Sequence, residues 1–214
     1  PTRTRLARMG KQYLGMGEAG DGKVHPDAVP VDLTDLAVQM VVAEGDTATW
    51  DALYQRLVGT QDPVLRGRYL RALSSVRDAR ADKALALALD PSLRANEVLM
   101  PLRAQLADVR TRDAALSWFQ QSFDALARRL PETQLGATPF LFASFCSDRT
   151  AQELESFFGP RIQTLTGGPR SLAAAVEALR LCTAKIAAQR SSVEAFFASR
   201  RGALAKPAAI KATP

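Results

Sequence analysis

The stretch that decides the fold is residues 41–90, VVAEGDTATWDALYQRLVGTQDPVLRGRYLRALSSVRDARADKALALALD. Its apolar residues recur at the i, i+3, i+4, i+7 spacing of an amphipathic helix, and no run alternates strictly as a strand does. One apolar stripe comprises Trp50, Leu53, Tyr54, Leu57 and Val58. The next comprises Leu65, Tyr69, Leu70, Leu73 and Val76. The spacing therefore predicts successive helices over this stretch.

Polar residues beside these stripes predict where the helices begin and end. Asp46 stands at an N-cap position, where its carboxylate can accept from the free amides of the first turn. Asp62 followed by Pro63 marks a second helix start, because proline suits the first turn. Gly45 is expected to supply the left-handed stop of the preceding helix.

The same helical spacing extends over the rest of the chain. Helices are expected over residues 95–107, where Pro101 either kinks the helix or marks its start, and over 111–130, capped by Thr111 with Asp113. Further elements are expected at 138–146 and 148–159. A run from 170 to about 200 is either one long helix or two with a joint near Ser191-Ser192. Residues 15–31, rich in Gly, Asp and Pro, are expected to form a long loop.

This pattern predicts an all-α fold of roughly nine to eleven helices with short connections. Antiparallel helical pairs joined in this way are expected to stack as a HEAT/armadillo-like solenoid. Residues 1–204 are expected to form a single domain, and residues 205–214 a disordered tail. The start at Pro1 suggests a piece of a longer polypeptide.

The chain of 214 residues has a single histidine, His25. A catalytic zinc site usually needs two or three imidazoles or a Cys/His set, so this chain is not expected to build one. His25 precedes Pro26 in a polar loop, which favours an exposed side chain over a catalytic base. We therefore assign no catalytic, cofactor-binding or metal-binding residue.

The two cysteines, Cys146 and Cys182, are 36 positions apart and form no Cys-x-x-Cys motif. This spacing fits neither a zinc site nor a redox site. Each lies in an apolar run, which favours two small buried side chains, with a single disulfide as the alternative. The sequence leaves the compartment open, cytoplasmic or periplasmic/secreted.

Other polar and aromatic side chains carry no specific signal of a site. Trp50 and Trp118 lie in or beside helical stripes, which favours packing over a ligand site. The arginine pairs are interpreted as ordinary cations of polar helix faces: Arg66/Arg68, Arg128/Arg129 and Arg200/Arg201.

The net charge of +6 does not indicate a nucleic-acid partner, because the charge is uneven along the chain. Residues 161–214 carry nine of the 28 basic residues and only two of the 22 acidic ones, Glu177 and Glu194. The tail cations have no aromatic residues between them on which bases could stack. No apolar run approaches the length of a membrane span. We therefore expect no nucleic-acid partner and no membrane span.

Residues 41–90 resemble the C-terminal helical domain of the zinc aminopeptidase family that includes aminopeptidase N, puromycin-sensitive aminopeptidase and the endoplasmic-reticulum aminopeptidases. The residues that carry this resemblance are Gly45-Asp46, Thr49-Trp50-Asp51, Asp62-Pro63, Leu70-Arg71-Ala72-Leu73 and Arg77-Asp78. Further matches are Phe123-Asp124-Ala125-Leu126, Phe145-Cys146-Ser147 and Phe157-Phe158. The resemblance covers about residues 30 to 200.

The resemblance implies a role beside a catalytic domain that this chain lacks. In such enzymes a separate domain carries the His-Glu-x-x-His zinc site, and neither that motif nor a Gly-x-Met-x-Asn motif occurs here. The helical domain would close over the catalytic domain of the same polypeptide and enclose a cavity for peptide substrates. Zinc would belong to the parent enzyme, which removes N-terminal amino acids, and this chain alone would be inactive. The alternative is a stand-alone helical-repeat interaction module.

Overall fold

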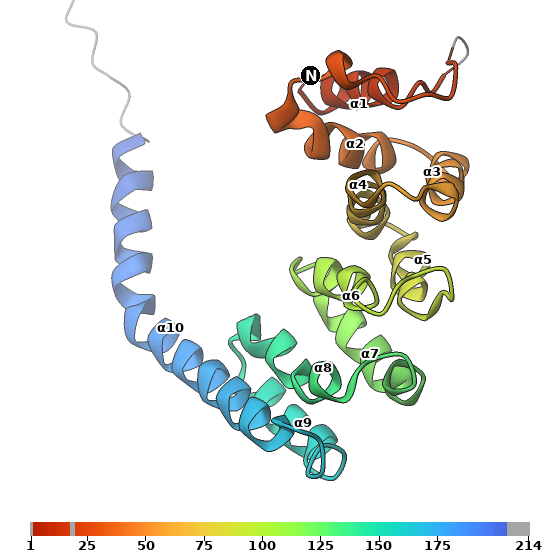
Figure 1. Cartoon of the computed structure of the whole chain (residues 1–214). Coiled ribbons are helices and arrows are strands. Elements are labelled where there is room, and N and C mark those ends of the chain that lie inside the picture. Colours follow the sequence, from red (N-terminus) through yellow and green to blue (C-terminus); the bar gives the residue numbers. More distant parts are fainter. Residues whose placement is uncertain (1, 18–19, 205–214) are drawn as a thin grey trace, which may run out of the picture. The chain divides into compact units, whose positions relative to one another are not determined.

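A computed structural model describes residues 2–17 and 20–204, with side chains as far as Arg200. These residues form ten α-helices and four short 3-10 helices, and no strand, which confirms the all-α class and the expected number of helices (Figure 1). The α-helices are α1 (Thr2–Tyr13), α2 (Thr34–Ala43), α3 (Thr47–Gly59), α4 (Pro63–Ser74), α5 (Ala81–Ala86), α6 (Leu99–Leu106), α7 (Arg112–Ala127), α8 (Glu132–Gly136), α9 (Asp148–Phe158) and α10 (Gly168–Leu204). The 3-10 helices are η1 (Pro26–Ala28), η2 (Val31–Leu33), η3 (Leu87–Leu89) and η4 (Thr138–Phe145). The tail expected at 205–214 lies outside the described residues.

The chain divides into two compact units, which we call unit 1 (Pro1–Leu135) and unit 2 (Gly136–Pro214). In unit 1, α1 packs on α2, α2 and α3 on α4, α4 on α6, and α6 on α7. Contacts of this kind, between neighbouring helices and between every second helix, are those that stacked helix pairs require. The HEAT/armadillo-like solenoid and the single domain over 1–204 stay predictions.

Side chains of every helix from α2 to α5 meet in the core of unit 1. Leu53, Leu57, Leu70 and Leu73 are fully buried there, together with Val38 of α2. The predicted stripes of residues 41–90 therefore do form apolar faces that hold these helices together, except at Val58, which is 40% exposed.

Both predicted aspartate caps are confirmed. The Asp46 carboxylate accepts the amide of Thr49 at 2.8 Å, and the Asp62 carboxylate accepts the amides of Val64 and Leu65 at 2.8 and 3.2 Å. Each bond satisfies an amide that has no partner within its own helix.

The prediction of a left-handed conformation at Gly45 is wrong. Gly45 is not one of the described glycines that have a positive φ. Glycine is needed there for space. A Cβ atom on Gly45 would lie 2.6 Å from the carbonyl oxygen of Val41 and 2.7 Å from the Thr49 side chain. The chain therefore passes from α2 to α3 through a gap that only glycine fits.

Thr111 does not cap α7 with its side chain as expected. It stands at the N-cap position, but its hydroxyl donates to the carbonyl oxygen of Gln105 at 2.7 Å. Pro101 lies in the first turn of α6, which begins at Leu99, so of the two alternatives it marks the start of a helix.

Unit 2 consists of η4, α9 and the long helix α10 around a phenylalanine cluster. Phe142 and Phe158 are fully buried and their ring centroids lie 6.3 Å apart. Between the two alternatives for residues 170–200, the structure has one continuous helix that runs through Ser191-Ser192.

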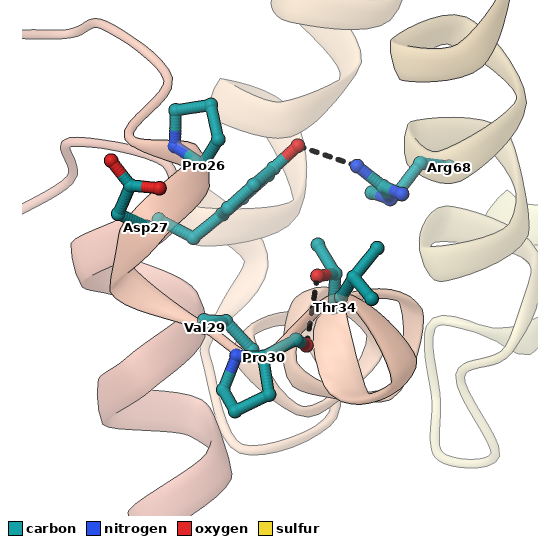
Figure 2. A pocket seen from close by; sticks show the side chains of 8 residues that line it. Pro26, Asp27, Val29, Pro30, Thr34 and Arg68 are labelled. Carbon is teal, nitrogen blue, oxygen red and sulfur yellow. Dashed lines mark hydrogen bonds between the residues drawn. The ribbon is translucent and has the colours of Figure 1, made fainter.

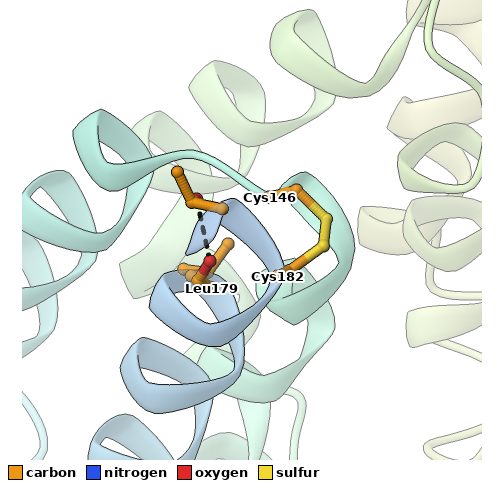
Figure 3. Close-up of a disulfide and its surroundings, with 4 residues drawn as sticks. Cys146, Leu179 and Cys182 are labelled. Carbon is orange, nitrogen blue, oxygen red and sulfur yellow. Dashed lines mark hydrogen bonds between the residues drawn. A yellow bond between two sulfur atoms is a disulfide. The ribbon is translucent and has the colours of Figure 1, made fainter. Parts of the chain in front are cut away.

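The interpretation of Cys146 and Cys182 as two buried thiols is wrong. A disulfide joins them, with Cα atoms 5.0 Å apart, and both residues are half-buried (Figure 3). Cys146 follows η4 with a φ of 50°, in the left-handed region, and this turn presents its side chain to α10. The disulfide thus ties the end of η4 to the middle of α10.

Candidate functional site

The arginine side chains of unit 1 are built into the fold. Arg66 is only 4% exposed and forms a two-pronged ion pair with Glu97, at 2.7 Å from Nε and 2.9 Å from Nη2. It also donates to the carbonyl oxygens of Leu57 and Ser92 at 2.9 and 2.6 Å. The interpretation of Arg66 as a polar-face cation is therefore wrong.

Several other arginines also donate to backbone carbonyls of distant segments. Arg129 donates to Ala88 and Leu93, both at 2.8 Å, so it too is more than a surface cation. Three further cases are Arg56 to Leu14 at 2.6 Å, Arg77 to Ala104 at 2.8 Å and Arg80 to Val42 at 3.0 Å. Such bonds satisfy carbonyls that helix ends leave free, and they tie successive helices of unit 1 together. Arg128 and Arg200 are exposed as predicted, and the side chain of Arg201 lies outside the described residues.

The packing role predicted for the tryptophans is confirmed for Trp50. It is 2% exposed, its indole N–H donates to the carbonyl of Leu73 at 3.2 Å, and its ring stacks on Tyr54 with centroids 5.7 Å apart. Trp118 is half-buried on α7.

His25 lies exposed in the loop before η1, as predicted. Its Nε2 atom lies 2.9 Å from a carboxylate oxygen of Asp21, a contact that the sequence analysis missed. The pKa of Asp21 is lowered, first by the backbone amide of Lys23 and then by this histidine. The pair closes the loop on itself and faces solvent.

Unit 1 has a pocket of about 540 Å³ where the end of α1, η1, the start of α2 and α4 meet. We call it the Tyr13–Arg68 pocket. The Nη1 atom of Arg68 donates to the hydroxyl of Tyr13, and a dashed line from the labelled Arg68 marks this hydrogen bond in Figure 2. Pro26, Val29 and Pro30 form apolar walls. The pocket thus combines apolar walls with the fixed Arg68 cation and the Asp27 carboxylate.

Arg68 is held in this pocket by Asp35 of α2. Its Nε donates to one carboxylate oxygen of Asp35 at 2.6 Å, and Arg71 donates to the other at 2.7 Å. Burial alone would raise the pKa of Asp35, but the hydrogen bonds from these two arginines lower it below its ordinary value. Asp35 therefore stays ionised and fixes the direction of the Arg68 side chain.

Unit 2 has a smaller pocket of about 370 Å³ between α9 and α10. Leu172 and Val176 supply apolar walls, and Arg180 binds both carboxylate oxygens of Glu155 at 3.0 Å on its rim. The lining of each pocket suits a ligand that has an apolar group next to a charged one.

The described residues do not fit a zinc ion. No group of three or more His, Cys, Asp or Glu side chains in the described part of the chain is placed to share a metal. The one histidine is paired with Asp21, and both cysteines are in the disulfide. Among residues 2–17 and 20–204, no helix combines the length and the apolar character needed to cross a bilayer.

The fold defines the class of protein, an all-helical domain. Residues 1–181 match the family model described as "ERAP1-like C-terminal domain". The chain therefore belongs to the family of ERAP1-like C-terminal domains, which confirms the resemblance drawn from the sequence. None of the curated proteins compared with the chain matches it.

Family membership makes this chain an aminopeptidase-family C-terminal domain. The sequence predicts no site residue, and its pattern indicates Arg68 only as a cation of a polar helix face. Tyr13 and Asp35 were missed because their roles depend on contacts between helices 33 or more positions apart.

Proposed function

We propose that this chain is the C-terminal domain of a zinc-dependent aminopeptidase and closes over the catalytic domain of the same polypeptide. The catalytic domain would hold the zinc and remove N-terminal amino acids from peptides. The helical domain would complete the wall of the peptide-binding cavity and exclude bulk water. The observation that carries this proposal is the family match over residues 1–181.

The internal arginine bonds of unit 1 support a role as a rigid wall. A domain that closes over a cavity must move as one body, and the buried Arg66–Glu97 pair with its carbonyl contacts ties α4 to Leu57 of α3 and to the segment 92–97 that precedes α6. The Tyr13–Arg68 pocket offers a fixed cation and apolar walls to a bound chain.

The proposal is tested by sequencing the full coding region and expressing the polypeptide with and without residues 1–214. A His-Glu-x-x-His motif is expected upstream, with zinc bound by the full polypeptide and not by this chain. Removing the chain is expected to change peptide-length dependence more than the hydrolysis of short aminoacyl anilides, because only long peptides reach the cavity wall.

An upstream region without the motif would overturn the proposal and favour the helical-repeat interaction module. Equal length dependence with and without the chain would refute the cavity-closing role while leaving family membership intact.

A further inference from the structure

An apolar seam runs along α10 at intervals of seven residues. Leu172, Leu179, Ile186 and Val193 occupy it. A seven-residue spacing keeps side chains on one side of a helix and is the pattern that packs against another helix. Up to Cys182 the seam is covered by η4 and α9, and Leu179 is fully buried.

Beyond Cys182 the seam continues without cover. Every residue from Ala184 to Arg200 is exposed, and Figure 1 shows this half of α10 extending beyond η4 and α9. Ile186 is 46% exposed and Val193 48%, and Phe196 and Phe197 pack edge to face on each other beside them. We call Ile186, Val193, Phe196 and Phe197 the distal seam. It lies outside the residues 1–181 that match the family model.

The charges beside the distal seam are mainly positive. Lys185 and Arg190 flank Ile186, and Arg200 lies over the ring of Phe196, 5.1 Å from its centroid. Glu194 is the one carboxylate between residues 184 and 200. The ion pair found for α10 in the described residues joins Arg180 to Glu155, so Lys185 and Arg190 keep their charge unpaired.

These charges favour one kind of binding partner for the distal seam over another. In a second copy of this chain packed along the same seam, cations would meet cations at the flanks, which is unfavourable. A helix with Asp or Glu at its flanks would form ion pairs there and cover the apolar residues. We propose that the distal seam binds an amphipathic α-helix of a protein partner whose apolar stripe is flanked by acidic residues.

Two designed peptides of about three heptads test this proposal. Both carry leucine at the seam positions, and one has glutamate at the flanks where the other has lysine. Fluorescence anisotropy with the whole 214-residue chain is expected to show that the glutamate peptide binds at least about tenfold more tightly, and that added salt weakens it.

Variants of the chain locate the binding face. Ile186→Asp and Phe197→Asp are expected to lower the affinity of the chain for the glutamate peptide about tenfold or more. Leu181→Asp is the matched control, because Leu181 is 62% exposed on the same helix but lies off the seam, and it is expected to bind as the parent chain does. Far-UV circular dichroism checks that each variant keeps its helices.

Four results would overturn the proposal. These are no binding of either peptide, equal binding of both, an equal loss in Leu181→Asp, or a dimer in sedimentation velocity that Ile186→Asp dissolves. Binding to phosphatidylserine vesicles that Ile186→Asp abolishes, without peptide binding, would assign the seam to a membrane surface instead.

Discussion

Helix α4 and the second half of α10 show opposite uses of an arginine-containing helix. In α4, Arg66 is buried and all its charge is met by Glu97 and two carbonyls. In α10 beyond Cys182, Lys185 and Arg190 are exposed beside apolar residues that are themselves about half exposed. The same residue types thus serve internal cohesion in one region and remain available to a partner in the other. Mutations of α4 should therefore change the free energy of unfolding more than mutations of the second half of α10.

The largest effect is expected from Arg66→Ala. It leaves the Glu97 carboxylate buried without its partner, so the free energy of unfolding should fall by about 3–5 kcal/mol. Both tryptophans lie in unit 1, so urea unfolding followed by tryptophan fluorescence reads this unit alone. Arg128→Ala, at an exposed position, is the control and should change little. Equal effects of the two variants would contradict the buried pair.

Loss of the disulfide should come next. It closes a loop of 36 residues in unit 2, so Cys146→Ser/Cys182→Ser should lower the free energy of unfolding by about 3–4 kcal/mol. Far-UV circular dichroism follows the helices of both units, and tryptophan fluorescence identifies the part of the transition that belongs to unit 1. A reductant should destabilise the parent chain to the same extent and leave the double variant unchanged. Two free thiols found in the oxidised parent chain would refute the pairing.

Removal of an N-cap should have a moderate effect. Asp46→Ala leaves the amide of Thr49 without its acceptor, so unit 1 should unfold at a lower urea concentration. Asp124→Ala, at an exposed position within α7, provides the comparison. A loss as large in Asp124→Ala would show that charge and not capping is responsible.

The pH dependence of stability should show a smaller contribution from Asp78. Arg80 hydrogen-bonds its carboxylate and lowers its pKa from 3.8 to about 2. The unfolded chain therefore takes up a proton at this position at higher pH than the folded chain. The stabilising contribution is present above about pH 4 and is lost as the pH falls toward about 2. Urea midpoints measured across this range should fall less steeply in Asp78→Asn.

The smallest effect is expected from Val193→Ala. Val193 is 48% exposed and touches no core, so the free energy of unfolding should change by less than about 0.5 kcal/mol. Thermal unfolding by circular dichroism measures it. A loss of 2 kcal/mol or so, the scale of a core valine or leucine, would show that the distal seam is covered within the chain itself.

Helices and their aspartate caps could be predicted from the sequence because both are local. The spacing of Leu70 and Leu73 and the position of Asp62 depend on neighbours within one or two turns. The spacing of Arg66 in the sequence indicated that it would be buried, but its charge favoured an exposed position. Arg66 precedes Tyr69, Leu70 and Leu73 by three, four and seven positions, which places it on the buried stripe.

The pocket and the disulfide could not be derived in this way. Arg68 meets Tyr13 across 55 positions, and Cys146 meets Cys182 through a left-handed turn after η4. No periodicity reports which helices will be neighbours or where one residue reverses the chain. Exposure of the distal seam was equally hidden, since Ile186 and Val193 continue the stripe of buried Leu179 without a break.

The Cys146–Cys182 disulfide also has a mechanical consequence. At about 1.5 Å per residue, Phe197 stands some 22 Å along the helix from Cys182, the last point at which α10 is fastened. The half of α10 beyond Cys182 is therefore held at one end only, at the disulfide. A rotation of the helix axis by about 10° at Cys182 displaces Phe197 by roughly 4 Å, given that rise per residue. A load applied at the distal seam would reach η4 through this disulfide and through the packing of α10 on η4 and α9.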